Sequence, residues 1–329
     1  MTKGLVTIFG GSGFIGRYAA RELVKKGWRV RVACRRVGLA GDVRLAGAPG
    51  WVDLAQANVR DRASVERAMD GADAVVNLVG ILDERGKQTF ESTIHEGSAL
   101  IAEVAAEKGI SRFVQVSAIG ADAESRSAYA RAKAEAEAAV RAAIPAATIL
   151  RPSIVFGPED GFFNKFAQMA RFTWFMPLIG GGRTRFQPVY AGDVARAIAV
   201  TVDDASTAGQ TYELGGPRTY TFSELTDFIL KTAERPRFRI GLPFFLARPL
   251  GYFAGAIWRY IPPFSWGFLG DVPVTGDQVE MLRSDNVAAD GAPGLKDLGI
   301  TAPETIEAIV PTYLWRFRPH GQFSQPSEA

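Results

Sequence analysis

Tyr129 and Lys133 are the two residues of this sequence whose types and spacing best suit proton transfer. They lie in an alanine- and glutamate-rich segment that predicts a helix, where residues four apart share a face. A nearby ammonium lowers the pKa of a phenol, which is ordinarily about 10. Ser117, at the end of the preceding predicted strand, could polarise the same carbonyl or alcohol. These residues predict either a hydride-transfer site with proton exchange or a clamp that only holds a ligand.

Gly10, Gly13 and Gly16 belong to the motif GGSGFIG, which stands between an apolar run and a helix-like segment. Glycines at this spacing permit a tight turn, close approach of backbone amides to a pyrophosphate, and close packing of helix on strand. The helix N-terminus would face the phosphates with free N–H groups and the positive end of its dipole. The motif predicts a dinucleotide site, and a purely structural glycine turn is the alternative.

Arg35 and Arg36 end the second predicted strand, where NAD-binding proteins usually have a carboxylate for the ribose hydroxyls. Two guanidinium groups suit the 2′-phosphate of NADP, so the sequence favours NADP(H), with NAD(H) as the alternative. Both arginines could instead be solvated at a strand end. Asp61 follows at a position from which a loop could reach the adenine edge, although a solvated loop aspartate is equally common.

The elements that must position these residues alternate along the first half of the chain. Apolar runs predict strands at 5–10, 28–34, 72–80, 112–118 and 147–157. Amphipathic segments predict helices near 14–26, 62–70, 92–108 and 127–143. The alternation predicts an α/β fold, a Rossmann-type doubly wound parallel sheet with a smaller, partly helical C-terminal cap domain.

The second half of the chain is rich in aromatic residues and proline. We expect a dinucleotide-binding domain at 1–157, to which the chain returns at 186–216. We also expect a cap domain at 158–185 and 217–315, and a disordered tail at 316–329. The stretch 242–270 is unusually apolar, but two arginines and a proline interrupt it, so no transmembrane segment is predicted. It is either part of a lid packed over the sheet or a surface for a membrane or a large partner.

Composition narrows the class of protein. The net charge is only +3 and basic residues are interspersed with acidic ones, so no nucleic-acid partner is expected. No zinc-finger spacing is present, and no metal site is predicted. The single cysteine, Cys34, excludes an intramolecular disulfide and suits a reducing compartment. The first predicted strand begins almost at Met1, which leaves no room for a signal or transit peptide, so we expect a cytoplasmic protein.

Five motifs, in their order along the chain, resemble those of the short-chain dehydrogenase/reductase superfamily in its extended or atypical branch. They are GGSGFIG, NLVG (77–80), VSAIGAD (116–122), YARAK (129–133) and RPSIVFGPED (151–160). The resemblance implies catalytic roles for Ser117, Tyr129 and Lys133. It also implies that the cofactor is bound by Gly10, Ser12, Gly13, Phe14, Ile15, Gly16, Arg35, Arg36, Asp61, Asn77, Leu78, Val79, Gly80, Tyr129, Lys133, Pro152 and Ile154.

Two positions depart from the superfamily pattern. His95 stands where many extended members have an asparagine that relays protons, so it either takes that role or is a helix histidine tied to neighbouring backbone. Ser117 lies twelve residues before Tyr129, whereas extended enzymes often place this serine much further ahead. Both departures weaken the prediction of ordinary catalysis and favour a cofactor clamp.

Three later segments resemble, more narrowly, the NAD(P)H-binding accessory subunits of respiratory complex I and their bacterial relatives. They are PLIGGGRTRFQPVYAGDVARAI (177–198), VTGDQVEML (274–282) and DNVA (285–288). This implies a structural dinucleotide, partners among complex I subunits or the inner-membrane surface, and a peripheral position on the cytoplasmic face of that membrane. The alternative hypothesis is an active NAD(P)-dependent oxidoreductase, or a sugar-nucleotide epimerase or dehydratase, acting on a small-molecule substrate.

Overall fold

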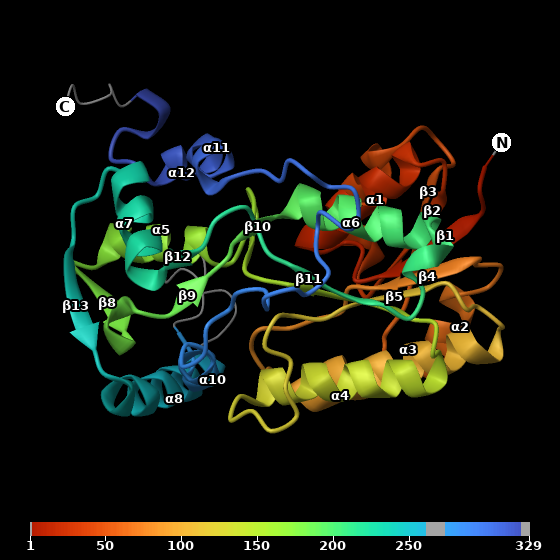
Figure 1. The fold of residues 1–329 in the computed structure, drawn as a ribbon, viewed down its shortest axis with the longest axis horizontal. Coiled ribbons are helices and arrows are strands. Elements are labelled where there is room, and N and C mark those ends of the chain that lie inside the picture. Colours follow the sequence, from red (N-terminus) through yellow and green to blue (C-terminus); the bar gives the residue numbers. More distant parts are fainter. Residues whose placement is uncertain (1, 261–273, 324–329) are drawn as a thin grey trace. The chain divides into compact units, whose positions relative to one another are not determined.

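The computed structural model describes residues 2–260 and 274–323 (Figure 1). The chain divides into two compact units. The first, here called the sheet unit, comprises Met1–Pro152, Ala191–Gly215 and Ala288–Pro303. The second, here called the aromatic unit, comprises Ser153–Tyr190, Gly216–Val287 and Glu304–Ala329. The segment 288–303, which we expected in the cap, thus belongs with the sheet.

Seven parallel strands form the sheet, in the order β11-β6-β5-β4-β1-β2-β3. Their bounds are β1 (Leu5–Phe9), β2 (Arg29–Cys34), β3 (Val52–Gln56), β4 (Ala74–Asn77), β5 (Phe113–Val116), β6 (Thr148–Pro152) and β11 (Thr211–Leu214). The chain winds outward from β1 in one direction and from β4 in the other, so the loops after these two strands diverge at the carboxyl edge of the sheet, which is where such folds bind ligands. The predicted Rossmann-type fold is confirmed.

Two strands of this sheet, β3 and β11, were not among the strands that we predicted. Both lie at the edges of the sheet, and several of their side chains are partly or fully exposed, so neither forms a continuous apolar run. The single strand predicted at 147–157 is in fact two. β6 ends at Pro152, and β7 (Val155–Phe156) pairs instead with β10 (Val189–Tyr190) in the aromatic unit.

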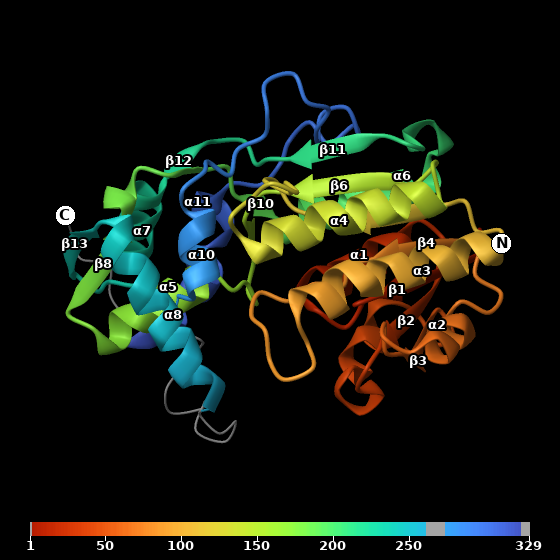
Figure 2. The same ribbon diagram turned by 90° about the horizontal axis from the view of Figure 1, so that it is seen from below.

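Helices cover both faces of the sheet (Figures 1 and 2). On one face α1 (Phe14–Lys25) packs against α6 (Ala191–Asp203), and on the other lie α2 (Arg62–Ala68), α3 (Glu96–Glu107) and α4 (Ala128–Ala143). A π-helical turn, η3 (Glu91–His95), leads into α3. Short 3₁₀ turns are η1 (Val37–Leu39), η2 (Gly41–Ala46) and η5 (Ala205–Thr207). The helices bury many alanines, which allows their backbones to lie close to the strands.

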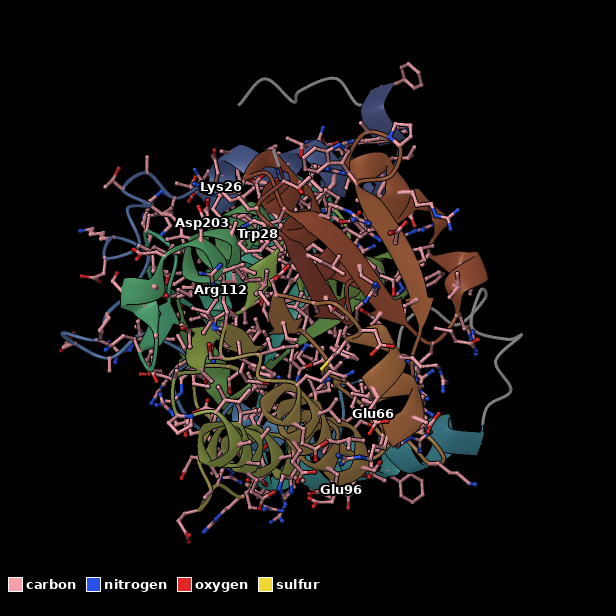
Figure 3. The ribbon with its side chains drawn as sticks, turned by 90° about the vertical axis from the view of Figure 1, so that its right-hand side faces the viewer. Lys26, Trp28, Glu66, Glu96, Arg112 and Asp203 are labelled. Atoms are coloured by element: carbon pink, nitrogen blue, oxygen red, sulfur yellow. The ribbon has the colours of Figure 1, made fainter. Side chains whose placement is uncertain are left out.

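Structural contacts close the amino end of the sheet (Figure 3). Trp28, just before β2, donates its indole N–H to Asp203 at 3.3 Å, and the guanidinium of Arg112 stacks 5.4 Å from the indole ring. Lys3 binds the same carboxylate at 2.6 Å. Because this end is occupied by the protein's own side chains, the carboxyl end is the edge of the sheet that remains for a ligand.

Three two-stranded sheets and six helices make up the described part of the aromatic unit. Besides β7 with β10, β8 (Phe175–Ile179) pairs with β13 (Phe238–Leu242) and β9 (Arg185–Phe186) pairs with β12 (Tyr220–Thr221). The helices are α5 (Phe163–Phe172), α7 (Phe222–Thr232), α8 (Phe244–Tyr260), α10 (Gly276–Met281), α11 (Ile306–Ile309) and α12 (Pro311–Leu314), and 3₁₀ turns are η4 (Gly180–Gly182), η7 (Trp315–Phe317) and η8 (Gly321–Phe323). Packed phenylalanine rings dominate the core of this unit.

A buried carboxylate organises that core. Asp160 is 3% exposed and accepts from the backbone N–H groups of Phe163 (2.6 Å), Asn164 (3.3 Å) and Gly157 (3.3 Å), and from the hydroxyl of Tyr313. Burial raises the pKa of Asp160, and these hydrogen bonds oppose the rise. The carboxylate thereby satisfies the first N–H groups of α5 and ties α12 to them.

The C-terminal segment is more ordered than we predicted. The prediction of a disordered tail from residue 316 is wrong for residues 316–318, because Phe317 is buried in the aromatic core and the side chains on either side of it are bonded. Arg316 donates to the Asn164 side chain at 2.6 Å, and Arg318 donates to the Thr232 carbonyl at 3.0 Å. Residues 324–329 lie outside the described residues.

The apolar stretch 242–270 is described as far as Tyr260, the last residue of α8, and its remainder lies outside the described residues. Over the two described ranges, the chain contains no helix with the length and hydropathy needed to span a bilayer.

Candidate functional site

The glycine motif forms the turn between β1 and α1. Gly10 has a φ of +79°, a left-handed conformation that favours glycine, and its carbonyl accepts from the N–H of Gly13 at 3.0 Å. Gly16 is packed so closely on this turn that a Cβ there would lie 2.5 Å from the Cα of Gly11. Gly13 is the N-cap of α1 and supplies no side-chain cap. The turn therefore presents backbone N–H groups at the helix N-terminus, as pyrophosphate binding requires.

The end of β2 lies beside this turn. Cys34 is buried, and burial raises the pKa of its thiol, while hydrogen bonds from the Ser12 side chain and the Arg36 backbone oppose the rise. Arg35 and Arg36 follow with exposed side chains. Arg35 donates to the side chain of Gln88. Two guanidinium groups are thus available where the ribose of a bound dinucleotide would be expected.

Asp61 is the N-cap residue of α2 and is exposed. Its carbonyl accepts from the N–H groups of Ser64 and Val65, both at 3.1 Å, and its side chain makes no capping bond. The Asp61 carboxylate therefore does not bond to the N–H groups at the start of α2.

Asn77, at the end of β4, has a structural role. Its amide group donates to Ser98 and to Gln115, both at 2.9 Å, and its oxygen accepts from the N–H of Val79 at 3.0 Å. These bonds fix the course of the chain through Leu78, Val79 and Gly80, which are partly buried or exposed. This segment adjoins the glycine turn, since a Cβ on Gly10 would lie 3.0 Å from the Leu78 carbonyl carbon.

Lys133 lies at the carboxyl ends of β4 and β5. It is 4% exposed, its ammonium donates to the Val116 carbonyl at 3.1 Å, and a Cβ on Gly80 would be 3.7 Å from its Nζ. Burial lowers the pKa of Lys133 from 10.5 to about 8, and the charge of Glu137 opposes the decrease. Burying an ammonium with a single carbonyl partner is unfavourable, and this is common where a ligand completes the site.

Tyr129 and Ser117 flank this lysine. Tyr129 is partly buried on α4, packs edge-on against Phe90 with ring centroids 5.8 Å apart, and has its ring centroid 5.9 Å from the Lys133 Nζ. The Ser117 hydroxyl is buried and has no hydrogen-bond partner within the described part of the chain. The structure therefore brings Ser117, Tyr129 and Lys133 together at one edge of the sheet. A buried hydroxyl left in this state is a position where a ligand group could bind.

Pro152 and Ile154, which we predicted on the basis of the resemblance, belong to different units. Pro152 ends β6, and its carbonyl accepts from the N–H of Ile119 at 3.0 Å. Ile154 lies in the aromatic unit, where its N–H donates to the Asn286 side chain at 3.1 Å and its side chain packs against the aromatic core.

His95 does not follow the simpler of our two expectations, a bond to neighbouring backbone. Its Nδ1 is 2.8 Å from the Glu91 carboxylate and 3.6 Å from the Glu135 carboxylate. Ligand atoms of these three residues lie within 4.8 Å of one another, close enough to hold a metal ion, although we predicted no metal site. The histidine therefore lies between two glutamate carboxylates at the start of α3.

One residue that our sequence analysis missed is Glu137, four residues after Lys133 on the same face of α4. It is 7% exposed and pairs with Arg151 through two bonds of 2.9 and 2.6 Å. Arg151 in turn lies 3.6 Å from Glu213 on β11. The spacing YARAKAEAE contained the signal for Glu137, but only the sheet order shows that an arginine on β6 meets it.

Comparisons with known proteins agree with this geometry. Residues 6–215 match the NAD dependent epimerase/dehydratase family. The chain is 36% identical over 322 residues to NADH dehydrogenase (ubiquinone) 1 alpha subcomplex subunit 9, mitochondrial, of Arabidopsis thaliana, covering 96% of this chain and 79% of that protein. The protein of the same name from Mus musculus is 32% identical over 301 residues, covering 90% and 76%.

The fold is shared with solved structures. An NADPH-dependent quinone oxidoreductase from Escherichia coli, solved with NADPH, has a TM-score of 0.71 at 18% identity, covering 94% of this chain and 99% of that one. The predicted resemblance is confirmed. The glycine turn, the exposed arginines after β2, and the buried Ser117 and Lys133, which have hydrogen-bonding capacity left over within the described residues, all fit a bound dinucleotide. The chain belongs to the NAD dependent epimerase/dehydratase family, with its NAD(P)-binding Rossmann fold and with alpha subcomplex subunit 9 proteins among its relatives.

Proposed function

We propose that this protein is an NADP(H)-binding accessory or assembly subunit of respiratory complex I, NADH:ubiquinone oxidoreductase, with the dinucleotide as a structural ligand. The extent of its similarity to the Arabidopsis subunit carries the proposal. That similarity covers 96% of the chain, so it includes the aromatic unit, whereas the family match ends at residue 215. Its partners would be complex I subunits at the inner-membrane surface, and it would lie peripherally on the cytoplasmic face of that membrane.

A structural role for the dinucleotide has a physical rationale in the sheet unit. Lys133 is buried with its pKa lowered, and the Ser117 hydroxyl is buried without a partner in the described residues. Both features cost folding free energy in the empty protein. A ligand that bonds to these groups binds only the folded state and stabilises it by mass action, without any turnover.

The proposed contacts distribute the dinucleotide along the carboxyl edge of the sheet. Lys133 and Tyr129 would bond the nicotinamide ribose, and the N–H groups after Gly10 would bind the pyrophosphate. Asp61 would reach the adenine, with the chain from Asn77 to Gly80 along the cofactor. The remaining contacts within the sheet unit would come from Ser12, Gly13, Phe14, Ile15, Gly16, Leu78, Val79 and Pro152.

NADP is proposed over NAD because of Arg35 and Arg36. Both are exposed at the end of β2, and neither position holds the carboxylate that accepts from the ribose hydroxyls of NAD. A guanidinium pair matches a 2′-phosphate through charge-assisted hydrogen bonds. Releasing and identifying the dinucleotide that co-purifies with the protein tests this assignment, and recovery of NAD alone would overturn it.

The second candidate is an active oxidoreductase or epimerase/dehydratase on a small-molecule substrate. The buried Ser117 hydroxyl favours it, since within the described residues it has no hydrogen-bond partner and could polarise a substrate carbonyl; Ser117 directly follows Val116, whose carbonyl accepts from Lys133. A bound nicotinamide would supply the hydride chemistry, and the Tyr129 hydroxyl would hold or release the proton, with Lys133 favouring its ionised form.

Tyr129→Phe separates the two functions. If the protein is an enzyme, turnover over a panel of carbonyl substrates falls about a hundredfold or more while dinucleotide retention is unchanged. If the tyrosine is only a clamp, no substrate is turned over by either form and retention alone weakens.

Co-purification from native membranes tests the proposed role directly. Tagged wild type is expected to bring down complex I subunits. Lys133→Met, which we expect to lose the dinucleotide, should bring down less, and the exposed-lysine control Lys108→Met should match wild type. Recovery of wild type free of any complex I subunit would refute the accessory role.

A further inference from the structure

Helix α8 has the reverse of the usual amphipathic arrangement. Among the α8 residues whose side chains are described, Phe244–Phe253, the most buried are Ala247 and Gly251. Gly251 packs so closely on α10 that a Cβ there would lie 2.9 Å from the N–H nitrogen of Gly276. The large apolar side chains point outward, with exposed fractions of 74% for Phe245, 60% for Leu250 and 71% for Phe253. A helix that packs through its small residues and exposes its large ones presents an apolar face to a partner.

The paired strands β8 and β13 repeat this arrangement. On one face of β8, Met176 is fully buried in the aromatic core. On the other, Phe175 pairs in register with Phe238, their ring centroids are 6.0 Å apart, and both are more than half exposed. Trp174, just before β8, is 73% exposed. We name these and the exposed apolar residues of α8 the aromatic surface: Phe172, Trp174, Phe175, Phe238, Ile240, Phe245, Leu246, Leu250, Tyr252 and Phe253.

Three arginines stand beside the strand part of this surface without an acidic partner. Arg171 stacks 5.6 Å from the Phe172 ring, and Arg237 stacks 5.5 Å from the Trp174 ring. Burial lowers the pKa of Arg235, and the charges of Arg237 and Arg171 lower it further. The Nε atoms of Arg235 and Arg237 donate to the carbonyls of Phe317 (2.6 Å) and Ala170 (2.8 Å), which leaves their positive charges without a counter-charge. None of the three forms an ion pair within residues 2–260 and 274–323. Such a cluster favours an anion.

The two sequence segments that carry this surface contain no acidic residue, and the nearby Asp227 on α7 is paired with Arg239 of β13. From 161 to 192 there are four basic residues and no acidic one, and from 235 to 270 there are five basic residues and again no acidic one. The whole chain has 35 acidic residues, so their absence from both segments is a local property. An anionic lipid surface is the partner that matches these features, because it accepts exposed aromatic rings and offers negative charge to the guanidinium groups beside them.

We infer that the aromatic surface docks the protein on a bilayer containing anionic lipids, with its rings among the headgroups and Arg171, Arg235 and Arg237 on lipid phosphates. The protein would lie on the bilayer and not cross it. This inference deepens the proposed function by naming the part of the chain that meets the membrane. Only the identity of the membrane rests on the proposed function, and the binding to anionic lipid does not.

Glu280 on α10 keeps α8 in its outward-facing orientation. The carboxylate is buried, and its two oxygens form ion pairs at 2.9 Å with the Nε atoms of Arg248 and Arg283, although neither oxygen accepts a hydrogen bond within the described residues. The Arg283 guanidinium also stacks 4.6 Å from the Phe244 ring at the start of α8. These contacts hold the small-residue face of α8 on α10, so that the large residues remain exposed before any membrane is present.

Flotation of the purified full chain with lipid vesicles tests the inference. One set of vesicles contains phosphatidylcholine with phosphatidylglycerol, and the other contains phosphatidylcholine alone. We expect wild type to float with the anionic vesicles and to bind neutral vesicles about tenfold or more weakly. Phe245→Glu with Phe253→Glu, and separately Trp174→Glu with Phe238→Glu, should each lower binding to anionic vesicles about a hundredfold. Arg237→Gln should lower it several-fold.

The control variant is Leu45→Glu, which removes an 85% exposed leucine from the sheet unit and should bind anionic vesicles as wild type does. Dinucleotide binding verifies that each variant is folded. Failure of wild type to float, or an equal loss in Leu45→Glu, would overturn the inference. If wild type does not bind vesicles, but the aromatic variants recover fewer complex I subunits than wild type in co-purification, then the surface binds protein and not lipid. If wild type floats but no complex I subunit co-purifies, the membrane inference stands and the accessory role fails.

Discussion

Asp160 in the aromatic unit and Lys133 in the sheet unit are both buried ionised groups, and they differ in how many hydrogen bonds the protein gives them. In the aromatic unit, Asp160 accepts from three backbone N–H groups and a tyrosine hydroxyl, so the carboxylate is fully bonded by the protein itself. In the sheet unit, Lys133 donates to a single carbonyl, and the nearby Ser117 hydroxyl has no partner in the described chain. Burial raises the pKa of Asp160 and lowers that of Lys133.

This difference separates a structural site from a ligand site. A buried group whose hydrogen-bonding capacity is filled stabilises the fold, and its removal leaves its partners unsatisfied. A buried group with unfilled capacity costs stability in the empty protein, and that cost is a signature of function.

Asp160→Ala should have the largest effect. The change leaves the first N–H groups of α5 and the Tyr313 hydroxyl without their acceptor, so we expect the free energy of unfolding to fall by about 3 to 4 kcal/mol. Chemical denaturation measures it. Asp227→Ala, which removes an exposed carboxylate paired with Arg239, should cost about 0.5 kcal/mol or less. Similar losses in the two variants would contradict a structural role for Asp160.

Lys133→Met should act on binding and not on folding. We expect dinucleotide affinity to fall about a hundredfold, because a charged donor to the ribose is lost. The empty variant should be at least as stable as the empty wild type, since an unfavourable buried ammonium is removed. Calorimetric titration and denaturation measure the two quantities, with Lys108→Met as control. An empty variant markedly less stable than wild type would mean that Lys133 is part of the structural core.

The stability of the empty protein should depend on pH through the same lysine. The folded pKa of Lys133 is about 8, below its ordinary 10.5, so between these values the unfolded chain binds more protons than the folded one. The free energy of unfolding should therefore rise by about 1 to 2 kcal/mol from pH 8 to about 9.5. The Lys133→Met variant should not show this increase in the free energy of unfolding. Parallel pH profiles for the two proteins would show that burial does not perturb the lysine.

Arg35→Ala and Arg36→Ala should have the smallest effects. Each should weaken NADPH binding about tenfold and leave NADH binding unchanged, because only NADPH carries the 2′-phosphate. Fluorescence titration of both nucleotides measures this ratio, and Arg44→Ala in η2 is the matched control. An equal loss for both nucleotides would place the arginines elsewhere on the cofactor.

Local patterns in the sequence determined much of the sheet unit. The glycine spacing of GGSGFIG predicted the turn between β1 and α1, because few other residues permit that close approach. The apolar runs predicted five strands and the Rossmann-type fold, and the spacing of Tyr129 and Lys133 placed them on one helical face. These features depend on residues near one another in the chain, so composition and period suffice to find them.

Only the tertiary structure decided the rest. Edge strands β3 and β11 lack an apolar signature because each has partly or fully exposed side chains. The Glu137–Arg151 pair, the bond from Lys133 to β5 and the unfilled hydroxyl of Ser117 join residues from different elements. The outward direction of Phe245 and Phe253 likewise depends on which face of α8 meets α10. Burial and charge pairing are properties of the assembled chain, and local sequence patterns do not encode them.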